Sequence, residues 1–297
     1  MGSAKAAVAS DPRAEDVPFE DHSSFVSGYS PRRVFFTYYR CASCDALYCP
    51  VFYTEKQLGA LYRRQAENMS EVPLPARERT QLGYAKLLMQ HSRGRGGFIE
   101  VGADIGLFAE QCAMIGQFDH LWLYEPNEGV HGQLDARFRN RPHTVRSEMW
   151  PRTDHPRPSC STGALIHVLD HLLNPAAFVT RIADTLEEGG VILAVTHDTG
   201  SLLARLLGRR FPPFALQHPQ LYSPASLTRL FERTGFEVTR IAPAVNYFPL
   251  MYLVRAGMTV LGLPLFLPRG LGPTIPVRLG NMAVVARKRS LSSLSTQ

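Results

Sequence analysis

From Phe98 onward, short apolar runs alternate with segments in which apolar residues recur every three or four positions. The runs predict β-strands and the periodic segments predict helices. We expect strands near Phe98–Val101, His120–Tyr124, Thr144–Ser147, Ala164–His167 and Val191–Thr196. We expect helices near Leu107–Met114, Gly129–Phe138 and Pro175–Leu186, with the glycines of EEGG ending the last one. This alternation predicts an α/β fold with a doubly wound parallel sheet.

The flanking segments have other patterns. Residues 1–30 are polar and without periodicity, and we expect them to be mobile or to lie on the surface. Residues 31–95 predict an extension with a cysteine-bearing turn, a helix that begins after Thr54, and a helix around Arg77–His91. SPASLTRLFERTGFEV predicts a capped helix followed by a strand, and NMAVVARKR predicts a final strand. The main domain is expected over residues 96–289, with an apolar insertion at 245–280 and a mobile tail at 290–297.

Composition limits the classes of protein to consider. The chain has 297 residues, 45% hydrophobic and 20% charged, which suits one large domain with appendages. The net charge of +6 is spread along the chain, so we expect no nucleic-acid partner. Five cysteines, an odd number, argue against a disulfide framework and favour a reducing, cytoplasmic location. The apolar stretch at 245–268 is interrupted by Pro249, Arg255 and Pro264, and its longest charge-free part is short of the ~20 residues of a membrane span.

The stretch GGFIEVGADIGLF, residues 96–108, leads from the first apolar run into a loop with Gly102 and Gly106. Such a loop lets the backbone approach a ligand closely. The dinucleotide fingerprint would need glycine at Asp104 and Leu107, and Asp104 would add negative charge beside a pyrophosphate. Together with Glu100, the loop favours a ligand that has an amino group or another cationic centre and no phosphates.

A second acidic position follows the next apolar run. In LYEPN, Glu125 comes about twenty residues after Gly106, where dinucleotide-binding folds carry the acid that binds a ribose. A carboxylate there can accept hydrogen bonds from both ribose hydroxyls. The sequence therefore predicts a nucleoside ligand, with a solvated acid at a strand end as the competing interpretation.

Several stretches occur in a recognisable order: EVGADIG, LYEPN, HVLDHLLNPAAF, LEEGGVILAVTHD and HPQLYSPASLTRLFERTGF. Over about residues 97–241 the chain resembles the class I S-adenosylmethionine-dependent methyltransferases, in particular the ubiquinone-type group with its VLEHL-DP motif. The resemblance implies a mostly parallel, seven-stranded Rossmann-like sheet and S-adenosyl-L-methionine as the cofactor. One departure is PSCSTGALIHV, which has no aspartate where the fourth strand usually begins.

The same resemblance implies a set of cofactor-binding residues. Glu100, Gly102 and Gly106 frame the methionine arm, Glu125 holds the ribose, and Glu148 or Met149 lies near the adenine. The full implied set is Glu100, Gly102, Asp104, Gly106, Glu125, Glu148 and Met149.

Histidines supply the remaining candidates. His167, Asp170 and His171 are spaced i, i+3, i+4, so on a helical turn they could meet at one divalent cation. They are similar to the E-x-x-E-H ligand set of ubiquinone-type O-methyltransferases. We favour the interpretation without a metal, in which His171 braces a short helix and His167 lines the pocket. His167, His171 and His218 are the candidates for a general base, with His197 also near the expected pocket, because a neutral imidazole can accept a hydroxyl proton.

The cysteine-bearing turn contains Cys41 and Cys44 in a C-x-x-C knuckle, with Cys49 close behind. It resembles the second half of the N-terminal zinc ribbon of related methyltransferases. The first half is missing, and His22 as a fourth ligand would lie at an unsuitable spacing. We predict a vestigial turn without metal.

These observations predict a methyltransferase that transfers the methyl group by in-line displacement, so the protein mainly aligns the reactants and excludes water. An oxygen acceptor needs a base, so the histidines favour O-methylation of a small-molecule, sugar or lipid-linked acceptor. The apolar insertion is expected to be a lid or wall of the acceptor site, or a helix buried on the sheet. The alternatives are a non-catalytic protein with this fold and a peripheral membrane module that binds lipid through the insertion and nearby arginines. The sequence does not indicate an oligomeric state.

Overall fold

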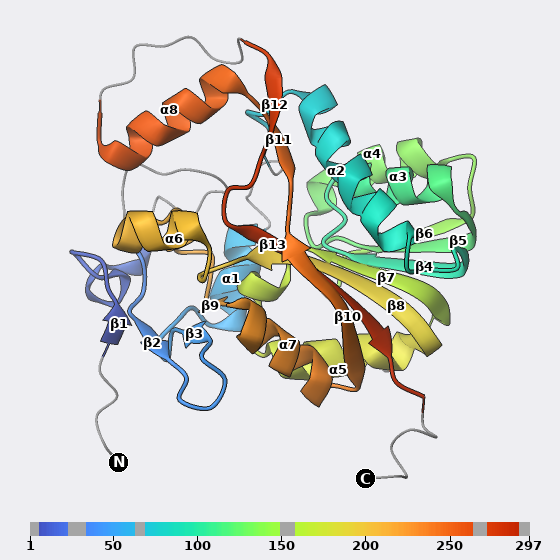
Figure 1. The fold of residues 1–297 in the computed structure, drawn as a ribbon, viewed down its shortest axis with the longest axis horizontal. Coiled ribbons are helices and arrows are strands. Elements are labelled where there is room, and N and C mark those ends of the chain that lie inside the picture. The colour runs from blue at the N-terminus through green and yellow to red at the C-terminus, as the bar shows by residue number, and fades with distance from the viewer. Residues whose placement is uncertain (1–5, 23–33, 63–68, 149–157, 264–271, 291–297) are drawn as a thin grey trace.

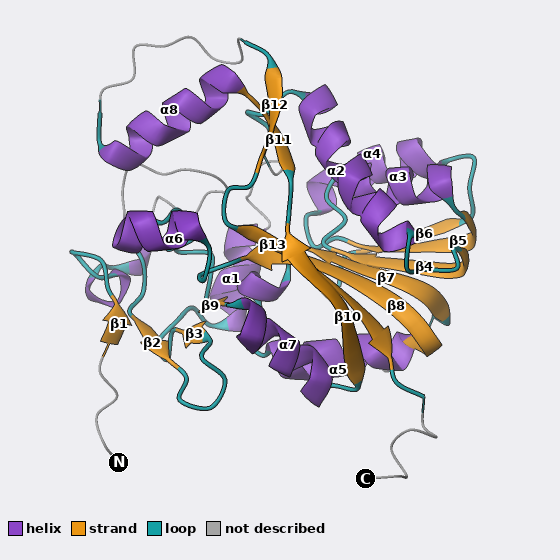
Figure 2. Ribbon diagram, viewed as in Figure 1, coloured by secondary structure: helices purple, strands orange, loops and turns teal. Residues whose placement is uncertain are grey.

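The computed structural model describes residues 6–22, 34–62, 69–148, 158–263 and 272–290, which include a central sheet with helices on both faces (Figure 1, Figure 2). The sheet has seven strands in the order β10-β13-β8-β7-β4-β5-β6. Its strands are β4 (Arg95–Val101), β5 (Gln117–Tyr124), β6 (His143–Arg146), β7 (Cys160–Ile166), β8 (Leu186–His197), β10 (Phe236–Pro243) and β13 (Asn281–Lys288). Neighbours among β8, β7, β4, β5 and β6 are parallel, whereas β13 is antiparallel to β8 and β10. The expected doubly wound, mostly parallel, seven-stranded α/β fold is confirmed.

Helices cover the two faces of the sheet as separate layers. Phe98 packs into the cluster beneath the first layer, and the next residue, Ile99, packs into the cluster beneath the second. The first layer consists of α2 (Leu74–Met89), α3 (Leu107–Ile115) and α4 (His131–Phe138), and the second of α5 (Pro175–Thr185) and α7 (Pro224–Arg233). Because both faces are covered, the central strands are apolar on both sides and appear in the sequence as continuous apolar runs.

Several boundaries differ by a few residues from their expected positions, and the largest difference is at the start of β8, which begins at Leu186 instead of Val191. The helix expected over Pro175–Leu186 ends at Thr185, and the glycines of EEGG lie within β8 instead of ending the helix. The pairing of β7 with β8 moves from Cys160 opposite Leu186 to Thr162 opposite Val191, so residues 187–190 bulge out of the ladder. Gly189 adopts φ +72° in this bulge, which explains why glycine is needed there.

The N-terminal extension is joined to the main domain through a small sheet. Helix α1 (Glu55–Tyr62) begins after Thr54 as expected, and Thr54 Oγ1 accepts a hydrogen bond of 3.3 Å from the backbone N–H of Gln57. The small sheet contains β1 (Ala6–Val8), β2 (Tyr38–Arg40), β3 (Leu47–Tyr48) and β9 (Gln220–Leu221). Because β9 comes from the main domain and pairs with β3, the extension is fixed beside the carboxyl end of the central sheet. Residues 1–5, 23–30 and 291–297, part of the segments expected to be mobile, lie outside the described residues.

The apolar insertion forms an excursion between the last two strands of the central sheet. It contains β11 (Asn246–Pro249), α8 (Leu250–Leu261) and β12 (Thr274–Val277), and β11 pairs with β12. Helix α8 lies away from the central sheet (Figure 1) and leaves Leu250 and Val254 exposed. The alternative of a helix buried on the sheet is therefore wrong. No helix in the described part of the chain is long and apolar enough to cross a membrane.

Candidate active site

A cavity of about 350 Å³ lies beyond the carboxyl ends of β4, β5, β7 and β8. Ligands of open α/β sheets bind at this edge, because the loops that follow parallel strands converge there. One end of the cavity is lined by Glu100, Gly102 and Glu125, and the other end by histidines. Helix α2 and strand β11 supply further parts of the wall, as do the start of α3, Leu203 and the segment 212–218. The fold thus brings the two groups of sequence candidates into one cavity.

The glycine loop after β4 has the close backbone approach that its sequence predicts. Gly102, Asp104 and Gly106 have φ values of +75°, +49° and +80°, a conformation that glycine adopts freely and aspartate tolerates better than most residues. A Cβ atom at Gly102 would lie 2.7 Å from Cγ2 of Val168. The loop is therefore specific for glycine at this position and brings bare backbone to the cavity wall.

Glu125 connects the glycine loop to the loop after β5. Its carboxylate accepts hydrogen bonds from the backbone N–H of Asp104 at 2.7 Å and from that of Asn127 at 2.8 Å. Burial raises the pKa of Glu125, and the two N–H donors partly offset this effect by stabilising the ionised form. Each carboxylate oxygen retains a second lone pair for a ligand hydroxyl.

Glu100 is the most deeply buried acid of the cavity wall, at 2% exposure. Its Oε2 atom has no hydrogen-bond partner among the described residues. Burial raises the pKa of Glu100 well above its ordinary value, and the nearby Asp104 and Glu125 add to the shift. A cationic ligand group would satisfy this oxygen and favour its ionised form.

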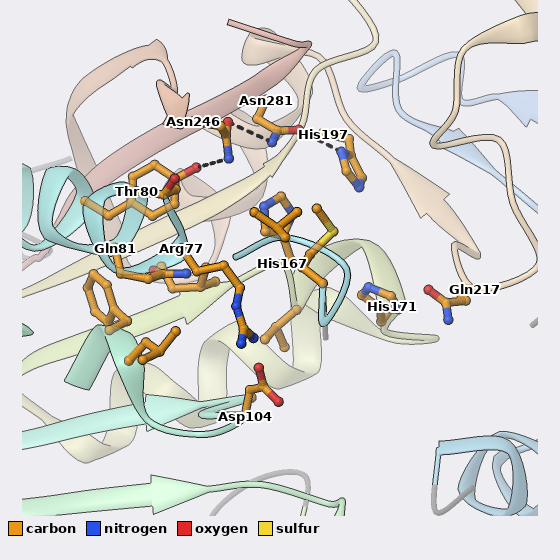
Figure 3. A pocket seen from close by; sticks show the side chains of 18 of the residues that line it. Arg77, Thr80, Gln81, Asp104, His167, His171, His197, Gln217, Asn246 and Asn281 are labelled. Atoms are coloured by element: carbon orange, nitrogen blue, oxygen red, sulfur yellow. Dashed lines mark hydrogen bonds between the residues drawn. The ribbon is translucent and has the colours of Figure 1, made fainter. Parts of the chain in front are cut away.

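Helix α2 lines the cavity with residues that the sequence analysis missed: Arg77, Thr80, Gln81 and Tyr84. Their spacing of i, i+3, i+4 and i+7 places them on one helix face, a signal that could have been read from the sequence. Figure 3 shows Arg77 reaching from α2 toward Asp104. The Arg77 guanidinium thus lies beside the glycine loop.

Two of the implied cofactor residues that the structure describes, Gly106 and Glu148, are not part of the cavity wall. Gly106 is the residue before α3, and neither it nor Glu148 is among the described residues that line the cavity. Glu148 lies in the bend after β6, and Met149 falls outside the described residues. Asp104 lines the cavity, as do Glu100, Gly102 and Glu125. The expected roles of Glu148 and Met149 near an adenine remain predictions.

The other end of the cavity is lined by His167, His171, His197 and His218. His167 follows β7 with φ +55°, His171 ends the 3₁₀ turn Leu169–His171, and His197 ends β8. The ring centroids of His167 and His197 are 5.1 Å apart, those of His197 and His218 are 4.9 Å apart, and those of His171 and His218 are 4.7 Å apart. All three catalytic candidates from the sequence therefore meet here. Burial lowers the pKa of His167 to about 4 and that of His218 to about 3, so both are neutral near pH 7.

Asp170 lies beneath these rings and is fully buried. Its Oδ2 atom is 3.4 Å from Nε2 of His197. Figure 3 shows a chain of hydrogen bonds behind His197, in which Asn281 Oδ1 accepts from His197 Nδ1 at 2.8 Å and Asn281 Nδ2 donates to Asn246 Oδ1 at 3.3 Å. Neither asparagine was a sequence candidate, because nothing local marks a residue whose partner lies on another strand.

The cysteine turn is separate from this cavity. All five cysteines are free thiols. His22, the ligand considered for a zinc ion at Cys41 and Cys44, uses Nδ1 for a 2.7 Å hydrogen bond with the Tyr53 hydroxyl and Nε2 for contacts with backbone carbonyls. His22 is therefore not available to complete a zinc site with these cysteines.

Comparison with known proteins settles the family. Residues 76–241, more than half of the chain, match the family model described as a methyltransferase domain. The chain belongs to this methyltransferase family. A search of curated proteins gave no match.

Solved structures agree with the fold of this methyltransferase. A Bacillus halodurans protein described as a methyltransferase is 14% identical, with a TM-score of 0.50 over 69% of this chain and 99% of that one. The YcgJ protein of Bacillus subtilis is 14% identical, with a TM-score of 0.50 over 71% and 98%. A structure from Haloferax volcanii, a complex between the Trm112 methyltransferase activator and a methyltransferase, is 10% identical, with a TM-score of 0.53 over 73% and 93%.

S-adenosylmethionine is the expected cofactor, and the described residues suit its chemistry. The unpartnered Oε2 of Glu100 suits the ammonium group of its methionine arm. Gly102 leaves room for that arm, and Glu125 offers lone pairs to two ribose hydroxyls. When bound, the cofactor supplies an electrophilic methyl group on a sulfonium.

Proposed function

We propose that this methyltransferase methylates a hydroxyl oxygen of a small-molecule, sugar or lipid-linked acceptor. The observation that carries the proposal is one cavity with two chemically distinct ends, acids and glycine at one and histidines at the other. The first end suits a cationic nucleoside and the second suits a group that must lose a proton. Methyl transfer to oxygen needs both within one site.

At the cofactor end, each group has a separate task. Glu125 holds the ribose, Glu100 faces the ammonium group, and Arg77 binds the carboxylate of the methionine arm. An arginine suits this task because its fork of N–H donors matches a carboxylate. These contacts fix the direction of the methyl group toward the histidine end and leave little room for water.

At the acceptor end, we assign the general base to the histidines. His218 donates from Nδ1 to the carbonyl of Pro213 at 2.7 Å, which leaves a lone pair on Nε2. His171 donates to the carbonyl of Gln217, and burial lowers its pKa. His167 is the third candidate, and no described residue forms a hydrogen bond to its ring. As the acceptor O–H bond breaks, its proton passes to an imidazole, the oxygen bonds to the methyl carbon, and the electron pair of the S–C bond stays on sulfur.

The surface beside the cavity favours a lipid-linked acceptor. Helix α6 (Leu202–Leu207) exposes Leu202 at 73% and Leu206 at 74%, while Leu203 of the same helix lines the cavity. A second depression is lined by Arg209 and Arg210 together with the C-terminal end of α8. Exposed leucines beside arginines suit an anionic membrane surface. We propose that residues 96–289 form the cofactor-binding domain and that the insertion at 245–280 covers the acceptor.

The test is methyl transfer from cofactor labelled in its methyl group to a panel of phenols, sugars, amino sugars and polyprenyl-linked sugars. We expect labelled ether products that hot base does not cleave, as distinct from esters. The variants His171→Ala and His218→Ala should lower kcat with little change in cofactor Kd. His143→Ala is the matched control, because His143 binds Asp135 at the surface. Tight cofactor binding with no turnover on any acceptor would support the non-catalytic alternative instead, and labelled amines would refute the choice of oxygen.

A further inference from the structure

Asp170 is a carboxylate without a partner of the usual kind. It is 0% exposed, and neither Oδ1 nor Oδ2 takes part in a hydrogen bond with any described residue. A buried carboxylate normally accepts hydrogen bonds or pairs with a cation, since leaving it bare costs several kcal/mol or more. Its nearest potential counter-charge is the imidazole of His197, whose Nε2 atom lies 3.4 Å from Oδ2, and three more histidines lie around it.

The nearest imidazole is oriented with its lone pair toward this carboxylate. Asn281 Oδ1 can only accept, so Nδ1 of His197 carries the proton in their 2.8 Å hydrogen bond. In the neutral tautomer Nε2 then presents a lone pair to Asp170 Oδ2 at 3.4 Å. With His197 in this tautomer two lone pairs face each other at this distance, and a bound cation, either a second proton or a metal ion, converts the repulsion into attraction. For ligand bonds of about 2.0–2.2 Å at a tetrahedral ion, neighbouring donor atoms are separated by about this distance.

A third donor completes the arrangement. His167, Asp170 and His197 each offer one ligand atom, and these atoms lie within 4.8 Å of one another. His167 comes from the end of β7 and His197 from the end of the neighbouring β8, and both line the cavity. The chain of Asn281, Asn246 and the Tyr84 hydroxyl behind His197 fixes its ring. Histidines that bind metals typically have such a partner on the other ring nitrogen.

We propose that His167, Asp170 and His197 bind one divalent transition-metal ion at the histidine end of the cavity. Two neutral imidazoles and one carboxylate suit zinc, iron or cobalt, whereas magnesium and calcium prefer oxygen ligands. Three protein ligands on one side leave coordination positions open toward the cavity, as in catalytic sites.

The ion deepens the proposed function and rests on it for its role. Bound to the acceptor hydroxyl, it would lower the pKa of that group, so that a weak base suffices. Assigning His167 to the ion leaves His171 and His218 to take the proton.

Metal binding can be tested without cofactor or acceptor. The full-length protein is dialysed against a chelator, freed of it, and titrated with Co²⁺ by absorption spectroscopy and with Zn²⁺ by calorimetry. We expect about one ion per chain and the d–d bands of a site with nitrogen ligands. Asp170→Asn and His197→Gln should each weaken binding by at least about 10–100-fold. Failure of the wild-type protein to bind either ion would overturn the proposal.

Matched variants locate the ion. Asp170, His171 and His218 form a second group that could hold a metal ion. If the ion is bound by His167, Asp170 and His197, the variant His171→Ala retains it. Loss of the ion from His171→Ala would refute the proposed ligand set. A Cys41→Ser/Cys44→Ser double variant must also retain it. If a thermal melt shows that Asp170→Asn does not fold, X-ray absorption of the zinc-loaded wild-type protein tests the ligand set instead. Nitrogen and oxygen ligands would support the assignment, whereas sulfur ligands or oxygen ligands alone would contradict it. Binding of one metal ion per chain without turnover on any acceptor would refute the proposed function and leave the metal site standing. Full turnover by the metal-free protein would refute the catalytic role of the ion.

Discussion

The variant Glu125→Ala tests the cofactor end of the cavity most directly. In the free protein the carboxylate of Glu125 already holds two backbone N–H groups, those of Asp104 and Asn127, at 2.7 and 2.8 Å. The substitution therefore removes two expected contacts to the ribose and also loosens the glycine loop. Both losses should be measurable, and they have different sizes.

The affinity loss follows from hydrogen bonds to a charged acceptor. Each is worth about 1.5–3 kcal/mol, so two correspond to about 3 kcal/mol or more and to a Kd raised by about 100-fold or more. The stability loss is smaller, because water can reach both freed N–H groups in these half-buried loops. About 2 kcal/mol would lower the melting temperature by roughly 4–8 °C.

The assay is isothermal titration with S-adenosylmethionine, paired with thermal denaturation of the free protein. Glu128→Ala is the control, since Glu128 is exposed and outside the cavity wall. We expect the control to match the wild type in both measurements. An unchanged Kd for Glu125→Ala would show that the ribose is bound elsewhere, even if the melting temperature falls.

Three further predictions concern other parts of the molecule. Gly102→Ala places a Cβ atom at a residue with φ +75° and 2.7 Å from Cγ2 of Val168, so it should lower the free energy of unfolding by about 2 kcal/mol or more in denaturant melts. The control Gly132→Ala lies in open space within α4 and should stabilise the protein slightly. Glu100→Gln removes a carboxyl whose pKa is raised by burial. The folded wild-type protein holds that proton more tightly than the unfolded chain, so its stability falls as the pH rises above 4.5, the ordinary pKa of a glutamate. The melting temperature of Glu100→Gln relative to the wild type should therefore increase from pH 5 to pH 9. A pH-independent difference would contradict the buried ionisation, and unreduced cofactor affinity would contradict the ammonium contact. Leu202→Ser/Leu206→Ser should abolish co-sedimentation with anionic vesicles and leave melting unchanged, and retained binding would rule out this surface.

The sequence by itself determined the elements and their class. Strands buried on both faces appear in the sequence as continuous apolar runs, whereas helices buried on one face have apolar residues every three or four positions. These patterns therefore identified the central strands and helices. Local signals also placed the start of α1 at Thr54 and that of α7 at Ser223, where a capping box forms within four residues. The glycines of EEGG led to a wrong prediction of the helix end, because glycine with a positive φ occurs both at helix ends and in β-bulges.

Only the tertiary structure decided which side chains meet. His197 touches Asn281 because β13 pairs beside β8 with these two residues opposite each other. His167 faces His197 because β7 and β8 are neighbours, although the two histidines are 30 positions apart in the sequence. The order of strands in a sheet depends on packing between distant segments, which no local pattern encodes. The glycine loop and Glu125 could therefore be found from the sequence, whereas the cluster around Asp170 required the fold.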